Sequence, residues 1–301
     1  NGNFIFSQPL TEDAGGNLMP VNISLVYNSN KGDAKYGFIG KHIQTNYQMY
    51  LVKQGGENWN NGYKYYLNDS DGTIHYFYFE NGNNTTGKDE DGLGYTLKVV
   101  DESTKTDGIN ANYVITDKDE NKMYFNSAGR LLCIKNPSGT SSSIKYENDK
   151  ISSVTDGAGR EYKYIYSTNN AKYLAHIEDP AGRRTSFDYR NGCLVKVKFA
   201  DGEEFEINYH GNHLIKYING IDGTNTYLEY DKSNQQRVKT MKWRSADEDA
   251  LESYTFEYLQ NETKITDIQN RSYTFQFNDF AQTTGTVSNT DGSAQFFKLN
   301  S

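Results

Sequence analysis

The sequence predicts an all-β protein, built as one long, twisted and curving antiparallel sheet of repeated hairpins. Two observations lead to this fold: a phrase of about twenty residues that recurs along the second half of the chain, and strands in which aromatic and polar residues alternate. A third observation is the frequency of Asn-Gly and Asp-Gly pairs, which tight hairpin turns prefer because both residues tolerate positive φ.

The recurring phrase begins near Gly129. It consists of a Gly or Asn, a Leu, two further residues, an Ile or Val, an Asp or Asn, a turn glycine and then an alternating aromatic strand. Successive turn glycines are 20, 23, 20 and 21 residues apart, and they are Gly139, Gly159, Gly182, Gly202 and Gly223. So even a spacing predicts a shell-like solenoid, in which each unit buries its apolar face only against neighbouring units or across the curve.

Aromatic residues occupy every second position of the strands that follow the turn glycines. One such series is Tyr162, Tyr164 and Tyr166, and another is Tyr254, Phe256 and Tyr258. Because successive side chains of a strand point to opposite faces, the rings share one face and polar residues the other. We therefore expect a sheet with one packed face and one solvated face, long enough to curl.

Before Gly129 the pattern is looser. Residues 21–27 alternate as a strand, residues 63–67 and 74–79 form a predicted hairpin, and the polar residues 81–91 are expected to be an exposed loop. The single helix candidate is residues 245–253. No linker separates independent domains, so residues 1–128 are expected to open the sheet and residues 129–301 to form the repeats, as one continuous unit.

Composition excludes several classes of protein. The net charge is −8, from 31 basic and 39 acidic residues, and no basic cluster exceeds a pair, which argues against nucleic acid as a partner. No apolar run approaches the ~18 residues of a membrane span. An aromatic content of 14% excludes disorder. Cys133 and Cys193 are expected to be free thiols, because about three repeats separate them.

Neither a catalytic site nor a cofactor or metal site is expected. His210 and His213 flank a predicted turn without a third ligand nearby in the sequence, and recognisable catalytic motifs are absent. The aromatic residues leave two interpretations open. Either they fill the packed face of the sheet, or some of them form a platform that stacks on sugar rings, for which the candidates are Trp59, Tyr63, Tyr65 and Trp243.

The phrases Asp156-Gly157-Ala158-Gly159-Arg160 and Asp179-Pro180-Ala181-Gly182-Arg183, with the Tyr-x-Tyr strand that follows the first, resemble the YD repeat of the Rhs family. The resemblance covers essentially the whole chain. It implies a large secreted or cell-surface bacterial protein whose repeats coil into a shell, which in toxin-bearing members encloses a C-terminal effector. Such arrays end in an Asp-Pro-x-Gly-Leu cleavage phrase, whereas residues 179–183 end in Arg within the array and are expected to be an ordinary turn.

Two functions follow as hypotheses. The first is a non-catalytic scaffold or shell segment of a secreted, cell-surface or cell wall-associated bacterial protein. Its partners would be the remaining repeats and the C-terminal cargo of a longer parent chain, since the sequence has neither an initiator Met nor a signal peptide. The alternative is a carbohydrate-binding surface module that holds surface polysaccharide on its exposed Trp and Tyr rings.

Overall fold

The structure is a computed structural model that describes residues 2–12, 19–32, 34–80, 82–100, 107–233, 236–244, 252–277, 283–288 and 294–299, with side chains up to residue 276. The chain is 53% strand and 2% helix, which confirms the predicted all-β, antiparallel fold. Most of the predicted helix at residues 245–253 lies outside the described residues, and its last two residues belong to a strand.

The elements follow one another as β1 (Ile5–Pro9), β2 (Ser24–Asn28), β3 (Ile43–Thr45), β4 (Tyr50–Lys53), α1 (Gly56–Asn60), β5 (Tyr63–Asn68), β6 (Ile74–Tyr78), β7 (Thr86–Asp89), β8 (Thr96–Val99), β9 (Tyr113–Thr116), β10 (Lys122–Phe125), β11 (Leu131–Lys135), β12 (Ser141–Glu147), β13 (Lys150–Thr155), β14 (Glu161–Tyr166), β15 (Leu174–Glu178), β16 (Arg184–Arg190), β17 (Cys193–Lys198), β18 (Glu204–Tyr209), β19 (Ile215–Asn219), β20 (Asn225–Tyr230), β21 (Val238–Arg244), β22 (Glu252–Leu259), β23 (Glu262–Asp267), β24 (Ser272–Phe277), β25 (Thr283–Ser288) and β26 (Ala294–Leu299).

From β4 onward the strands are ordered as in the chain and form a long, open antiparallel sheet. We expected the first 128 residues to open this same sheet, but β1, β2 and β3 form a separate three-stranded sheet, here called the N-terminal sheet. Its central strand is buried on both faces, as Leu25, Val26 and Tyr27 show. Such a strand fits between layers and not in a sheet with one solvated face.

The chain divides into two compact units. The larger, here called the N-unit, comprises Ile5–Cys193 and Phe199–Asp201, and the C-unit comprises Asn1–Phe4, Leu194–Lys198 and Gly202–Ser301. The change of sequence pattern at residue 128 falls within the N-unit. The division into an opening section, residues 1–128, and a repeat section, residues 129–301, stays a prediction.

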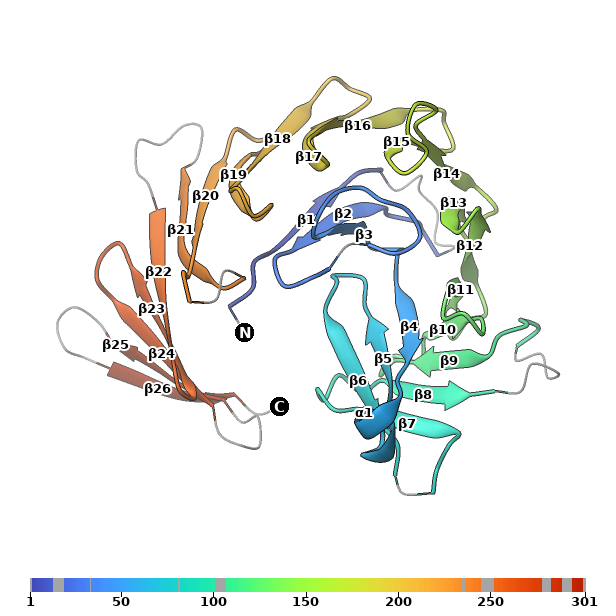
Figure 1. Cartoon of the computed structure of the whole chain (residues 1–301), viewed down its shortest axis with the longest axis horizontal. Helices are drawn as coiled ribbons and strands as arrows, with labels where there is room; N and C mark the ends of the chain where they lie inside the picture. The colour runs from blue at the N-terminus through green and yellow to red at the C-terminus, as the bar shows by residue number, and fades with distance from the viewer. Residues whose placement is uncertain are drawn as a thin grey trace. The chain divides into compact units, whose positions relative to one another are not determined.

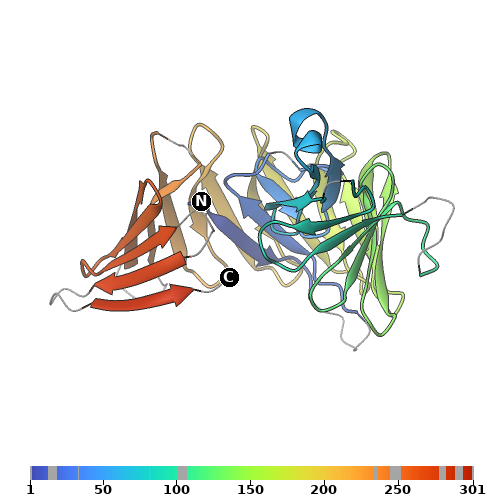
Figure 2. The same cartoon turned by 90° about the horizontal axis from the view of Figure 1, so that it is seen from below.

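In the N-unit, β4–β16 curve around the N-terminal sheet (Figure 1, Figure 2). The hydroxyl of Tyr164 on β14 donates to Thr45 Oγ1 at 3.2 Å, and the Leu174 amide donates to the Phe38 carbonyl at 3.1 Å. Tyr162, beside Tyr164 on the same face of β14, is fully buried. The N-terminal sheet therefore covers the packed face of the repeats in this unit.

The C-unit contains β18–β26 and nearly all of β17. Its first strands bury apolar residues on the packed face, among them Val197, Phe205 and Leu228. On β22, by contrast, Tyr254 and Phe256 are only half-buried, although they continue the same alternating pattern. Burial of the rings thus differs between the two units while the sequence pattern does not.

The expectation of an exposed loop at residues 81–91 was wrong in part, because β7 lies within it. This strand pairs with β6 and β8. A Cβ atom on Gly87 would come within 2.3 Å of the Phe79 ring. Gly87 therefore allows the Phe79 ring to lie directly on the strand. In the sequence alone, the same glycine indicates a loop.

Candidate functional site: the repeat turns and tyrosine locks

The repeat phrase folds into a turn whose aspartate holds the backbone. Asp156 Oδ1 accepts the amides of Ala158 and Arg160, each at 2.9 Å, while Oδ2 accepts Arg160 Nε at 2.6 Å. Gly159 supplies the positive φ of +84° that the turn requires. The same bonds recur in the turns that run from Asp179 to Arg183 and from Asp267 to Arg271.

These aspartates are nearly inaccessible, with side-chain exposures of 0% for Asp156, 6% for Asp179 and 2% for Asp267. Burial works against ionisation of Asp267, yet the hydrogen bonds from Arg271 hold the pKa of its carboxyl below the usual value. The buried carboxylate holds the turn in this conformation. A turn that moved the arginine away would leave the negative charge buried without its partner, which is costly.

A tyrosine locks four successive repeats from the other end, and we call this bond the tyrosine lock. Its hydroxyl donates at 2.7–3.0 Å to the carbonyl of the residue fifteen positions earlier, in the pairs Tyr146–Leu131, Tyr166–Ile151, Tyr189–Leu174 and Tyr209–Leu194. The strand register shifts at Tyr146, Tyr166 and Tyr209. A bulge of this kind re-aims a side chain, which here lets the ring reach back along its own repeat.

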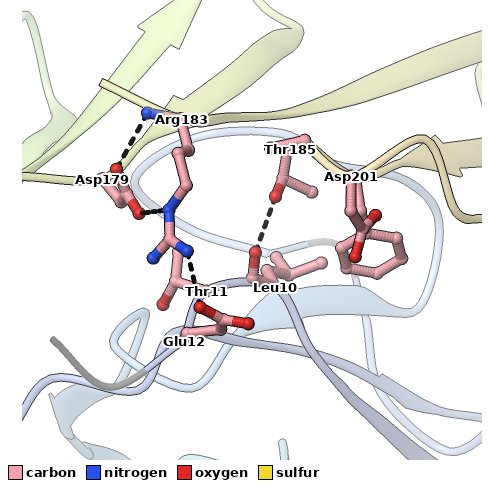
Figure 3. Close-up of a pocket in the computed structure, with 9 residues that line it drawn as sticks. Leu10, Thr11, Glu12, Asp179, Arg183, Thr185 and Asp201 are labelled. Carbon is pink, nitrogen blue, oxygen red and sulfur yellow. Dashed lines mark hydrogen bonds and ion pairs between the residues drawn. The ribbon is translucent and has the colours of Figure 1, made fainter. Parts of the chain in front are cut away.

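One repeat turn is also joined to the N-terminal sheet's outgoing loop. Figure 3 shows Arg183 between Asp179 and Glu12, and its Nη1 lies 2.5 Å from Glu12 Oε2. Thr185 Oγ1 donates to the Leu10 carbonyl at 2.6 Å. A hollow of about 240 Å³ adjoins these groups. Two carboxylates, one from the repeat turn and one from the segment after β1, already bind Arg183. The arrangement therefore connects the repeat sheet to the N-terminal sheet.

The five turn glycines named from the sequence occupy turns with φ between +75° and +93°, and they are Gly139, Gly159, Gly182, Gly202 and Gly223. Of the sugar-platform candidates, Trp59 on α1 and Tyr63 and Tyr65 on β5 lie in the N-unit, and Trp243 on β21 lies in the C-unit.

Two of the N-unit candidates, Trp59 and Tyr65, pack against each other, whereas Tyr63 is half-buried and its ring meets the rings of Tyr76 and Tyr78. Tyr65 is 4% exposed, and burial raises the pKa of its hydroxyl to about 12. The ring of Trp59 meets Tyr65 edge-on with centroids 6.0 Å apart. Lys53 Nζ and Lys64 Nζ lie 4.9 and 5.1 Å from the centroid of the Trp59 ring. Cations therefore already contact the indole of Trp59, and Tyr65 belongs to the core.

Trp243 stacks on Tyr254 with ring centroids 5.2 Å apart and 21° between the planes, and both rings are half-buried. Of the two histidines singled out near a turn, the His213 amide donates to the His210 carbonyl at 3.0 Å, and His210 Nε2 lies 2.9 Å from the Leu228 carbonyl oxygen, to which it donates in the tautomer that carries the proton there. Cys133 and Cys193 do not form a disulfide, as predicted, and both side chains are buried.

Among the residues that the structure describes, no group of three or more His, Cys, Asp or Glu side chains is arranged to hold a metal ion. Within that same part of the chain, none of the helical segments combines the length and the apolar character that crossing a membrane requires.

The tyrosine lock and the Arg183–Glu12 ion pair were not predicted. The lock has a sequence signal, since a tyrosine stands fifteen residues after the apolar residue that opens several repeats. The ion pair has none, because 171 residues separate its two members.

No protein-family model matches the chain, and no curated protein matches it either. Comparison with solved structures finds a Photorhabdus luminescens Tc holotoxin pore containing a mutated TccC3, with 9% identity over 94% of this chain and 19% of that one, at a TM-score of 0.35. A TcdB2–TccC3 crystal structure gives 9% identity over 94% of this chain and 23% of that one, at a TM-score of 0.23. This chain thus spans about a fifth of their length.

Proposed function

We propose that the chain is a non-catalytic scaffold or shell segment of the Rhs/YD-repeat type, within a large secreted or cell-surface bacterial protein. One observation carries the proposal: the aspartate turn and the tyrosine lock occur together in two successive repeats, as Asp156 with Tyr166 and as Asp179 with Tyr189. In both repeats, the polar groups that distinguish the phrase are bonded within the repeat itself.

The N-terminal sheet supports the same function. It fills the packed face of the N-unit through hydrogen bonds such as Tyr164–Thr45, so that face is occupied by the chain itself. In this proposal the partners are further repeats and a C-terminal cargo of the parent protein. These partners, the exported location and the lack of catalysis come from the resemblance of the repeat phrase to the YD repeat.

The alternative is a carbohydrate-binding module that uses Trp59, Tyr63, Tyr65 and Trp243. Burial of Tyr65 argues against a platform in the N-unit. The half-buried stack of Trp243 on Tyr254 is the one observation that favours this alternative.

Limited proteolysis of the parent protein tests the scaffold. Asp156→Ala removes the buried partner of Arg160 and should expose the repeat region to protease, whereas the matched variant Asp119→Ala, at an exposed turn carboxylate, should leave the cleavage pattern unchanged. The same preparations are screened for glycoside and peptide hydrolysis, and the purified chain on a glycan array. Turnover by this chain, or glycan binding abolished by Trp59→Ala or Trp243→Ala, would overturn the proposal.

A further inference from the structure

We propose that the solvent face of β19–β21 in the C-unit is a binding site for an anionic saccharide. The site consists of two tyrosine rings, Tyr217 and Tyr227, and two cations, Lys242 and Arg244. None of these residues belongs to the repeat turns, the tyrosine locks or the platform candidates described above.

The strand register brings the four side chains together on one face. Tyr217 pairs with Tyr227, and Tyr227 pairs with Lys242 on the next strand. The tyrosine rings lie 4.8 Å apart with 40° between their planes, and Tyr227 is 44% exposed. A hollow of about 260 Å³ adjoins Tyr227, and its other lining residues are Glu229, Thr240, Lys242 and Arg244.

Two neighbouring aromatic residues at this position depart from the repeat. The corresponding cross-strand pairs in the three preceding repeats are Ser153–Lys163, His176–Ser186 and Lys196–Glu206. The position therefore carries polar or charged side chains in those three repeats, and the fold does not need rings there. A pair of rings on the solvent face that the repeat does not require, with Tyr227 exposed, is typical of a recognition surface.

The cations at this position also differ from those of earlier repeats, in which solvent-face cations are paired with glutamates. Lys163 and Arg184 both pair with Glu178, and Lys196 pairs with Glu204 at 2.6 Å and Glu206 at 2.8 Å. Within the described part of the chain, neither Lys242 nor Arg244 takes part in an ion pair. Two uncommitted cations beside exposed rings attract an anion, although the chain as a whole carries a net charge of −8.

The combination of groups specifies the ligand's chemistry. Tyrosine rings offer flat apolar surfaces that match the C–H faces of a pyranose, while Glu229 and Thr240 can bond its hydroxyls. Lys242 and Arg244 would bind a carboxylate or sulfate on the sugar. A nucleic acid fits poorly, because two cations do not offset the repulsion of a polyphosphate by an acidic protein.

Isothermal titration of the purified chain tests the site with four probes: oligogalacturonate, a dextran sulfate oligomer, neutral dextran and inorganic polyphosphate. We expect one or both acidic saccharides to bind, the two arms separating carboxylate from sulfate, and neutral dextran and polyphosphate to bind at least about tenfold more weakly. Tyr227→Ala and Lys242→Glu should each weaken binding about tenfold without lowering Tm appreciably.

Two matched variants are the controls. Tyr63→Ala removes a half-buried ring and Lys163→Glu reverses a cation on the solvent face of an earlier repeat, and neither should change the affinity. Absence of binding by both acidic saccharides would overturn the site and leave the scaffold proposal intact. The site would also be overturned if Lys242→Glu weakened binding and Tyr227→Ala did not. That result would mean that the ligand is held by charge alone and not by the rings. Binding lost only in Trp59→Ala or Trp243→Ala would instead overturn the scaffold proposal.

Discussion

The N-unit and the C-unit use the same repeat but differ in what covers it. Tyr164 on β14 is 4% exposed, whereas Phe256, at the middle of the equivalent aromatic series on β22, is half-buried. The N-terminal sheet lies against the first ring and supplies it with a hydrogen-bonding partner, Thr45. Alternation decides which face of a strand is apolar, but a second layer decides whether that face is dry.

The repeat's own bonds do not differ between the units. The aspartate turn has the same geometry at Asp156 in the N-unit and at Asp267 in the C-unit, with the Nε–Oδ2 distance 2.6 Å in both. The tyrosine lock is likewise present at Tyr166 and at Tyr209. The comparison therefore separates two contributions to stability: local bonds that occur in repeats of both units, and burial that depends on a distant segment.

The largest effect is expected from truncating the matched rings. Tyr164→Ala should destabilise the N-unit by about 3–5 kcal/mol, because it leaves a cavity between two layers. Phe256→Ala should cost the C-unit only about 1–2 kcal/mol, since its ring is partly solvated already. Urea unfolding followed by hydrogen exchange of peptides from each unit measures both. Equal costs would mean that the N-terminal sheet adds no burial energy.

A second pair of variants contrasts two turn glycines with similar φ. A Cβ on Gly129 would lie 1.9 Å from the Leu51 carbonyl oxygen, whereas a Cβ on Gly202 would meet nothing within 4 Å. Gly129→Ala should therefore cost about 3 kcal/mol, and Gly202→Ala only about 1 kcal/mol of backbone strain. The shift in thermal midpoint distinguishes them, and a Gly202→Ala variant as unstable as Gly129→Ala would contradict the close approach.

Removing the tyrosine lock should affect the two units alike. Tyr166→Phe and Tyr209→Phe each delete one hydroxyl and leave a carbonyl without that donor, at a cost of about 1 kcal/mol. Tyr78→Phe, on an exposed ring, is the matched control and should have no effect. A markedly larger loss in one unit, measured by urea unfolding, would show that the lock is not a shared device.

The smallest effect is expected from acid. The hydrogen bond from Arg184, followed by that from Lys163, lowers the pKa of Glu178, and the hydrogen bond from Ser153 lowers that of Glu161. Because these folded-state pKa values lie below the unfolded value of about 4.3, their stabilisation is present above that pH and is lost as the pH falls through the folded values.

A Tm profile from pH 6 to pH 3 should consequently decline only slightly from this source, and Glu178→Gln should flatten the decline. The outcome also tests a rival cause of the difference between the units. If the N-unit lost its advantage over the C-unit on acidification, ion pairs on the solvent face, and not burial by the N-terminal sheet, would account for it.

Much of the fold could be predicted from local pattern. The period of the turn glycines and the alternation in residues such as Tyr162 and Tyr164 give the strands, their faces and their order, because neighbouring strands in this sheet are also neighbours in the chain. The N-terminal sheet was missed because the alternation from residue 21 to residue 27 is the same whichever strand it pairs with. Its partners are set by contacts such as Thr45–Tyr164, 119 residues apart.

The candidate sites were less accessible to sequence reasoning. Whether a ring such as Tyr65 is buried depends on rings that other parts of the chain bring against it, among them Trp59 of α1 and Tyr113 of β9. The pairing of Tyr217 with Tyr227 depends on strand register, and only the register shows that two rings replace a polar pair.

The contact between Gly129 and Leu51 also bears on self-association of the protein through the edge of its sheet. The Leu51 amide on β4 donates to the Gly129 carbonyl at 2.9 Å, and Tyr50 forms a bridge to Arg130 on the side of β4 that faces away from β5. An outermost strand normally offers free amides and carbonyls to any passing chain. Here a turn of the same molecule is bonded to the free edge of β4. Edge-to-edge polymerisation is therefore blocked at those residues.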